Sequence, residues 1–234
     1  MNTRTIQVYL DDSYIRELDA EVVEIRDGVI LDRTIFYAAS GGQPSDLGTI
    51  EGTRKYEVTE VTKLDEIVHR TDFQPAVGEK VKLKIDWERR YLLMRQHTAI
   101  HVVSSIAMKE FGAMITGNQI NQDYSRIDFN FKDWNGEISK SLQMRVNEEL
   151  RKNQEVTVLS MERDEILRME GALKVDLRLL PSTDTLRVVR IGDIDIQPDG
   201  GTHVKNTSEV GEIEIYKIEN KGKNNKRMYF SIHK

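Results

Sequence analysis

The distribution of histidine is the feature that most constrains how this chain can fold. Three of its five histidines fall in two short motifs that lie far apart in the sequence, with His97 and His101 in the first and His203 in the second. On a helix, residues i and i+4 lie on one face, so the imidazoles of His97 and His101 can reach a single metal ion. Catalytic zinc sites typically use three protein ligands and keep one coordination position open. The sequence therefore predicts a metal site that forms where a helix meets a distant turn.

The two motifs differ in how strongly each one indicates a metal. The first lacks the glutamate of the His-Glu-x-x-His zinc peptidases, because Thr98 follows its first histidine, and an ordinary helix can carry such a pair. The second reads Asp199-Gly200-Gly201-Thr202-His203, and its two glycines let the backbone turn so that Asp199 and His203 can point to one centre. A tight turn in which Asp199 bonds its own backbone is the alternative, and it leaves His203 unexplained.

Composition and charge limit the classes of protein to consider. Hydrophobic residues make up 38% and charged residues 31% of the 234 residues, as in a globular protein, and the absence of cysteine excludes disulfides and thiolate ligands. The N-terminus has no apolar signal core, and no run approaches the roughly 18 apolar residues of a membrane span. We therefore expect a cytoplasmic protein that does not associate with membranes.

The net charge of −5 argues against a general nucleic-acid coat, and we expect no binding to DNA. Local basic patches are nevertheless present. Residues 221–227 contain four cations, and Arg89, Arg90 and Arg95 enter the expected helix that carries the histidine pair. Each patch is either a solvated surface or a contact for phosphate groups.

The first part of the chain, residues 1–86, reads as a small β-barrel. Asp27-Gly28 predicts a hairpin turn between strands at residues 19–26 and 29–32, and further alternating segments follow at residues 33–38, 48–63, 66–70 and 81–86. A glycine-rich loop, Ser40-Gly41-Gly42-Gln43, lies within this part. It lacks the lysine of a nucleotide-triphosphate loop, but it can let a phosphodiester backbone or a substrate approach closely.

The second part, residues 87–234, mixes helices and strands without a βαβ rhythm, so the fold class is α+β with a mixed or antiparallel sheet and a metal-binding helix. Asp86 can cap that helix and Gly112 can end it, with Leu93, Ile100, Val103, Ala107 and Phe111 forming one buried stripe. We expect further helices at residues 138–150 and 162–169, and strands at residues 126–131, 155–160, 186–191, 212–219 and 227–233.

Taken together, the motifs resemble a known family. Four elements occur in one order and at similar spacing: residues 36–48 with the glycine-rich loop, residues 97–101, residues 200–204 and residues 220–230. They look like the editing half of alanyl-tRNA synthetase and its free-standing relatives, the AlaX trans-editing proteins. The resemblance runs from about residue 20 to the end of the chain, and the glycine-rich element points to the medium-length class, which keeps the barrel.

The resemblance implies a deacylase with one zinc ion per chain that hydrolyses tRNA(Ala) mischarged with serine, and also with glycine. His97, His101 and His203 match the zinc histidines, with His97 and His101 at the catalytic centre, and Thr98 matches a residue associated with recognition of the seryl hydroxyl. Gly41, Gly42 and Gln43 match the motif beside the editing pocket, and Lys223, Lys226 and Arg227 would contact tRNA phosphates, together with Arg89, Arg90 and Arg95.

The chain departs from the family pattern at the fourth ligand. Asp199 stands where the family usually has cysteine, and carboxylate oxygen is a harder ligand than thiolate. Ser40 and Ala38 also replace residues common in the glycine-rich loop. Two other functions stay open: a tRNA-binding module whose metal site is lost, and a deacylase of another substrate, such as seryl-tRNA(Thr) or a small ester.

Overall fold

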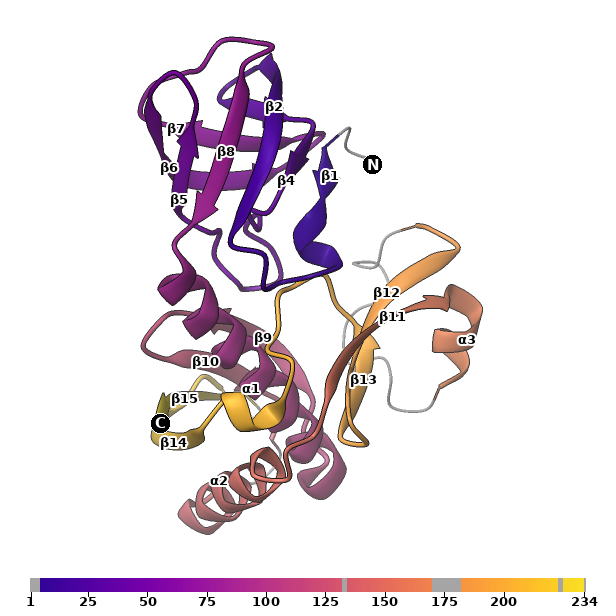
Figure 1. Cartoon of the computed structure of the whole chain (residues 1–234). Helices are drawn as coiled ribbons and strands as arrows, with labels where there is room; N and C mark the ends of the chain where they lie inside the picture. The colour runs from indigo at the N-terminus through magenta and orange to yellow at the C-terminus, as the bar shows by residue number, and fades with distance from the viewer. Residues whose placement is uncertain (1–4, 132–133, 170–181, 223–224, 234) are drawn as a thin grey trace. The chain divides into compact units, whose positions relative to one another are not determined.

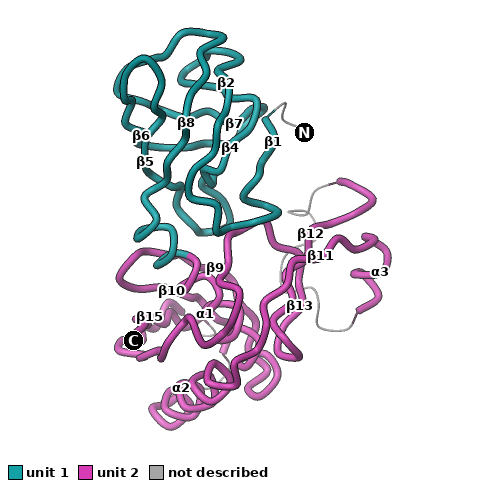
Figure 2. Tube along the Cα trace, in the orientation of Figure 1, with its two compact units in different colours: residues 1–93 teal, residues 94–234 magenta. Residues whose placement is uncertain are grey.

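The computed structural model describes residues 5–131, 134–169, 182–222 and 225–233, which form two compact units, Met1–Leu93 and Met94–Lys234 (Figures 1 and 2). The domain boundary expected after residue 86 falls at the start of helix α1 (Trp87–Phe111), whereas the division between the compact units falls within that helix. Among the described residues, no helix is long and apolar enough to cross a membrane.

The first unit contains the expected small barrel, which is closed and antiparallel (Figure 1). Asp27 and Gly28 both have positive φ at the tip of the predicted hairpin. The segment expected as one strand at residues 48–63 is two strands, and only the first two residues of 33–38 form one. In barrel order, the strands are β2 (Glu17–Ile25), β3 (Val29–Leu31), β7 (Ile67–Thr71), β6 (Lys55–Lys63), β5 (Gly48–Glu51) and β8 (Lys80–Ile85).

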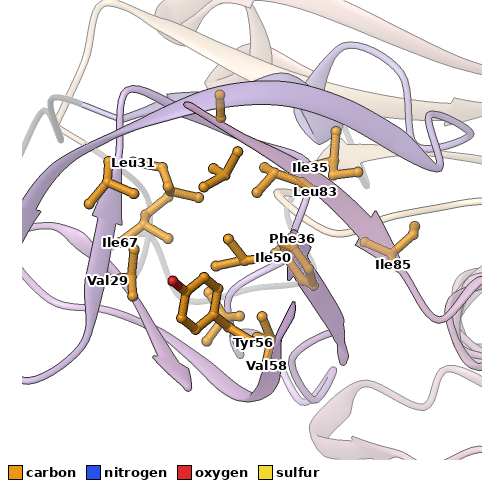
Figure 3. Packing of buried hydrophobic residues seen from close by; sticks show 14 of the residues in the cluster. Val29, Leu31, Ile35, Phe36, Ile50, Tyr56, Val58, Ile67, Leu83 and Ile85 are labelled. Carbon is orange, nitrogen blue, oxygen red and sulfur yellow. The ribbon is translucent and has the colours of Figure 1, made fainter. Parts of the chain in front are cut away.

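Apolar side chains fill the barrel, because alternate residues of a strand point to opposite faces. Leu31, Ile50 and Leu83 point into the interior from three different strands (Figure 3) and are fully buried. Burial of each such side chain stabilises the fold by about 1.5–3 kcal/mol. Beside the barrel, a short strand β1 (Ile6–Gln7) pairs in parallel with β4 (Arg33–Thr34), and a 3₁₀ turn, Val8–Leu10, follows β1.

The glycine-rich loop of the first unit is a tight hairpin. Gly41 and Gly42 have φ of 58° and 87°, and the backbones of Ser40 and Gln43 bond each other in both directions. Two successive positive φ values define a type I′ turn, which strongly favours glycine at both central positions. The Gln43 side chain is 2% exposed, so it lies within the unit and not on its surface.

Helix α1, within which the division between the units falls, is more deeply buried than the sequence indicates. It begins after Asp86, whose Oδ1 accepts a hydrogen bond from the Arg89 backbone, and it ends before Gly112, which has a φ of 63°, as predicted. The expected single buried stripe is wrong, because every residue from 93 to 107 is buried while Phe111 is partly exposed. The helix is therefore a central element, with polar side chains such as those of its histidines enclosed as well.

Two antiparallel sheets complete the second unit, one of four strands in the order β14-β15-β10-β9 and one of three in the order β11-β12-β13. Strands β9 and β13 were not predicted. The side-chain amide of Asn147 in helix α2 bonds both the N–H and the C=O of Ile213, and so covers the free edge of β14. The elements are β9 (Ile115–Ile120), β10 (Ser125–Phe129), α2 (Gly136–Leu150), β11 (Val156–Glu162), α3 (Arg163–Arg168), β12 (Thr185–Ile191), β13 (Asp195–Pro198), a 3₁₀ turn Thr207–Glu209, β14 (Glu212–Asn220) and β15 (Lys226–His233).

Candidate metal centre

The structure brings together the four side chains that the sequence proposes as ligands. His97 and His101 project from α1, while Asp199 and His203 come from the turn that follows β13. One nitrogen or oxygen atom from each of the four lies within 4.8 Å of all the others. The three imidazole rings have centroids 4.3–5.1 Å apart. The helix and the distant turn thus meet at one centre.

The carboxylate of Asp199 lies among the three imidazoles. Its Oδ2 is 3.4 Å from Nε2 of His97 and 3.6 Å from Nε2 of His101, and its Oδ1 is 3.2 Å from Nε2 of His203. All three rings therefore direct Nε2 to the same place. Three imidazole nitrogens and one carboxylate oxygen form a donor set that suits Zn²⁺.

The cluster is almost enclosed. The three histidines are 2–5% exposed, and the Asp199 side chain, at 19%, is the most accessible of the four. Burial opposes ionisation of Asp199, but the charge of His97 and hydrogen bonds from the other two histidines outweigh it and hold its pKa well below the usual range. Burial and the neighbouring His97 charge also hold the pKa of His203 well below its usual value.

Asp195, which the sequence interpretation missed, holds His101 from the other side, and Gln197, which it also missed, lies against the same ring. Nδ1 of His101 lies 2.8 Å from Oδ2 of Asp195, so His101 donates to a buried carboxylate through one nitrogen and presents the other to Asp199. Burial opposes protonation of His101, but the bonds to Asp195 and Asp199 raise its pKa to about 9. Carboxylates in this position fix the tautomer and orientation of a metal-binding histidine. The missed signal was the alternation Asp195, Gln197, Asp199, which places these side chains on one face of an extended segment.

The turn requires glycine at position 201 because of the space beside His97, and not because of the backbone freedom that the sequence predicts. Neither Gly200 nor Gly201 has a positive φ, so the turn does not depend on the conformational freedom of glycine. A Cβ atom on Gly201 would instead lie 2.5 Å from Nδ1 of His97 and 2.9 Å from Oδ1 of Asp199, whereas one on Gly200 would meet nothing within 4 Å. The backbone at Gly201 therefore forms part of the wall against which the His97 ring rests.

Thr98 joins the helix to the turn. Its hydroxyl lies 3.0 Å from the carbonyl oxygen of Met94, accepts from the backbone N–H of Val204 at 3.3 Å and lies 3.2 Å from Nδ1 of His203. The residue is fully buried. The role of Thr98 in recognising a seryl hydroxyl stays a prediction. Within the protein, the Thr98 hydroxyl connects α1 to the backbone at Val204.

The expectation that Arg90 and Arg95 contact phosphate is wrong. Arg90 is fully buried in the first unit, where it pairs with Asp46 and donates to two backbone carbonyls. Arg95 is 6% exposed and donates to the carbonyl of Val210. Arg89 is half-buried and donates to the carbonyl of Ser45.

The remaining predicted tRNA contacts lie on several parts of the chain. Arg227 in β15 forms a two-bond pair with Asp128 on the neighbouring strand, and Lys226 donates to Asn220 across the hairpin. Lys223 lies outside the described residues. Gly41, Gly42 and Gln43 form the hairpin of the first unit described above.

The comparisons with known proteins first place the chain among modules related to aminoacyl-tRNA synthetases. Residues 186–229 match the family model described as the second additional domain of threonyl- and alanyl-tRNA synthetases. Residues 3–89 match the model of class II (A) tRNA synthetases.

Full-length relatives then identify the family. The chain is 42% identical to the alanyl-tRNA editing protein AlaX-M of Saccharolobus solfataricus, over 97% of the chain and 99% of that protein. It is 38% identical to AlaX-M of Methanosarcina mazei, over 97% and 96%. It is also 39% identical to the alanyl-tRNA editing protein AlaX-L of Pyrococcus horikoshii, over 96% of the chain and 57% of that protein. The chain belongs to the AlaX family of alanyl-tRNA editing proteins.

Proposed function

We propose that this protein is a trans-editing hydrolase that deacylates mischarged tRNA(Ala), chiefly Ser-tRNA(Ala) and also Gly-tRNA(Ala). The observation that carries the proposal is the cluster of His97, His101, Asp199 and His203, whose donor atoms lie within 4.8 Å of one another. Relatives at 37–42% identity over nearly the whole chain are named alanyl-tRNA editing proteins, which supplies the class of substrate.

These four residues would hold one zinc ion per chain. Zinc, when bound, supplies a Lewis acid that stabilises negative charge developing on an oxygen of the ester. The enclosure by Gly201 and the alignment of three Nε2 atoms on one point support this assignment. Aspartate in place of a thiolate retains the negative charge of the donor set.

The residues of the chain would hold the ligands and position the reacting groups. Asp195 holds the ring of His101, and Thr98 ties the turn at Val204 to α1, so that ligands from both segments keep a fixed geometry. The aminoacyl group would enter from the side on which the Asp199 side chain is exposed. A rigid arrangement matters because small displacements of reacting groups cost large factors in rate.

The tRNA body would bind through the basic hairpin of β14 and β15 and through the glycine-rich loop. Lys226 and Arg227 offer positive charge to phosphates, although Asp128 neutralises part of it. Contacts of this kind release counterions, so we expect the affinity for tRNA to fall as salt increases. The tight Gly41-Gly42 turn carries no side chains that would obstruct an approaching RNA backbone.

The test is deacylation of seryl-, glycyl- and alanyl-tRNA(Ala), with zinc measured on the same preparation. We expect hydrolysis of the seryl and glycyl esters, sparing of the alanyl ester and about one zinc per chain. His97→Ala should abolish both zinc binding and hydrolysis. His233→Ala is the matched control, because that histidine is exposed on β15 and bonds Glu214.

Binding of tRNA without hydrolysis and without zinc would refute the proposal and leave a tRNA-binding module. Faster hydrolysis of seryl-tRNA(Thr) than of seryl-tRNA(Ala) would assign the activity to a different tRNA. Equal rates of hydrolysis with and without the tRNA body would indicate a small ester as the substrate.

A further inference from the structure

The side chain of Gln197 has an unsatisfied amide group beside the candidate metal centre. It lies in β13 between Asp195 and Asp199 and is 7% exposed. Its Nε2 is 2.8 Å from Nδ1 and 3.2 Å from Nε2 of His101, so the amide lies against the imidazole. Its Oε1 is buried and has no hydrogen-bond partner among the residues that the structure describes.

His101 cannot satisfy both ends of this amide. Its Nδ1 already faces Asp195 and its Nε2 already faces Asp199, so both ring nitrogens have carboxylate partners. If the oxygen and nitrogen of the amide exchange places, the oxygen meets the ring and the nitrogen is then buried without a partner. Buried polar groups in proteins are nearly always hydrogen-bonded to protein, water or a ligand, so this end of the amide is open to a polar group of a bound substrate.

The chemistry of the candidate substrates indicates which chemical group can bond this end of the amide. The seryl, glycyl and alanyl esters share an amino group and a carbonyl, and only the seryl ester carries a side-chain hydroxyl. A hydroxyl both donates and accepts, so it fits the free end of the amide in either orientation. The hydroxyl of Thr98 donates to the carbonyl of Met94 and accepts from the N–H of Val204, whereas Oε1 of Gln197 has no partner among the residues that the structure describes.

We propose that Gln197 is a specificity-determining residue that hydrogen-bonds the side-chain hydroxyl of the seryl ester. This inference rests on the proposed deacylase function. A site that pairs with a substrate hydroxyl favours the substrate that has it, because the analogue without it leaves the buried amide unpaired. Gln197 thus favours serine over alanine through a bond that alanine cannot make.

The experiment compares Gln197→Met with the wild type, because methionine keeps the length of the side chain and its packing against His101. Two readouts are needed: kcat/KM for seryl- and glycyl-tRNA(Ala), and the Kd of non-hydrolysable 3′-amide analogues of seryl- and glycyl-adenosine. We expect roughly a tenfold loss in both readouts for the seryl compounds, the size of one neutral hydrogen bond, and no change for the glycyl compounds or for zinc content. Asp195→Asn is the positioning control, and it should weaken zinc binding and lower both hydrolysis rates together.

The two readouts separate the failure of this inference from the failure of the proposed function. If the wild type hydrolyses neither ester, the deacylase function is refuted, and the analogue affinities still decide whether Gln197 reads the hydroxyl. Equal losses for seryl and glycyl compounds in Gln197→Met, or no loss for either, would overturn the inference and make Gln197 a support for His101 alone.

Discussion

Substitution of alanine for Gly201 tests whether the backbone wall beside His97 determines the geometry of the candidate metal centre. The added Cβ would lie 2.5 Å from Nδ1 of His97 and closer still to the neighbouring ring carbon. Ordinary contact between such atoms needs about 3.5 Å, so the ring must retreat by about 1 Å. Metal–ligand distances tolerate only about 0.2 Å, so His97 would leave the coordination sphere. We expect zinc affinity to fall by roughly 100-fold or more, since even indirect partners of a ligand contribute 10–100-fold.

The matched control for this prediction is Gly200→Ala. Gly200 precedes Gly201 in the same turn, neither residue has a positive φ, and a Cβ on Gly200 would meet nothing within 4 Å. The assay is competition for zinc against a chelator of known affinity, with circular dichroism to establish that both variants are folded. Equal zinc affinities for the two variants would refute the reasoning, because they would show that the turn yields without moving the ligand.

Three other predictions follow from buried polar groups. Asp195→Asn should lower zinc affinity by about 10–100-fold in the same competition assay, because the ring of His101 loses its carboxylate partner; an unchanged affinity would mean that packing alone orients the ring. Asp46→Asn should lower the free energy of unfolding in denaturant by about 3–5 kcal/mol, since it leaves the Arg90 guanidinium buried without its counter-charge; a loss below about 1 kcal/mol would mean that water reaches the pair. Burial lowers the pKa of His69 from 6.5 to about 4, so the unfolded chain takes up a proton at higher pH than the folded protein does. Between pH 6.5 and 4 the wild type should therefore lose about 3 kcal/mol of its free energy of unfolding, and His69→Gln should not show this loss. If the free energy of unfolding changes with pH in the same way for the wild type and for His69→Gln, the assignment of this loss to His69 is contradicted.

Much of the fold follows from local sequence signals. Asp27-Gly28 predicts a turn because few residue pairs accept the backbone that a tight hairpin needs, and both residues have positive φ in the structure. Asp86 and Gly112 mark the ends of α1 through a side-chain cap and a left-handed residue, and both features are interactions between neighbours in the chain. Signals of this kind are readable without knowledge of the tertiary structure.

Residues whose partners are distant in the sequence could not be assigned in this way. The sequence predicts Arg90 and Arg95 as surface cations because arginine is usually exposed. In this fold, carbonyls and a carboxylate surround their guanidinium groups. Strand β13 is short and lacks a run of β-branched residues, so it was missed, and with it the roles of Asp195 and Gln197. Their functional position depends on the register that brings this strand to His101.

The sequence by itself determined which residue types could hold a metal and that a helix must meet a glycine turn. A pair of histidines at i and i+4 shares a face in any helix, and Asp199 and His203 are joined by one short segment. Only the tertiary structure decided how the site is enclosed and oriented. The contact of Gly201 with His97, the bond from His101 to Asp195 and the unpaired amide of Gln197 all join α1 to the segment around β13. Such contacts arise from packing in three dimensions, and no local pattern encodes them.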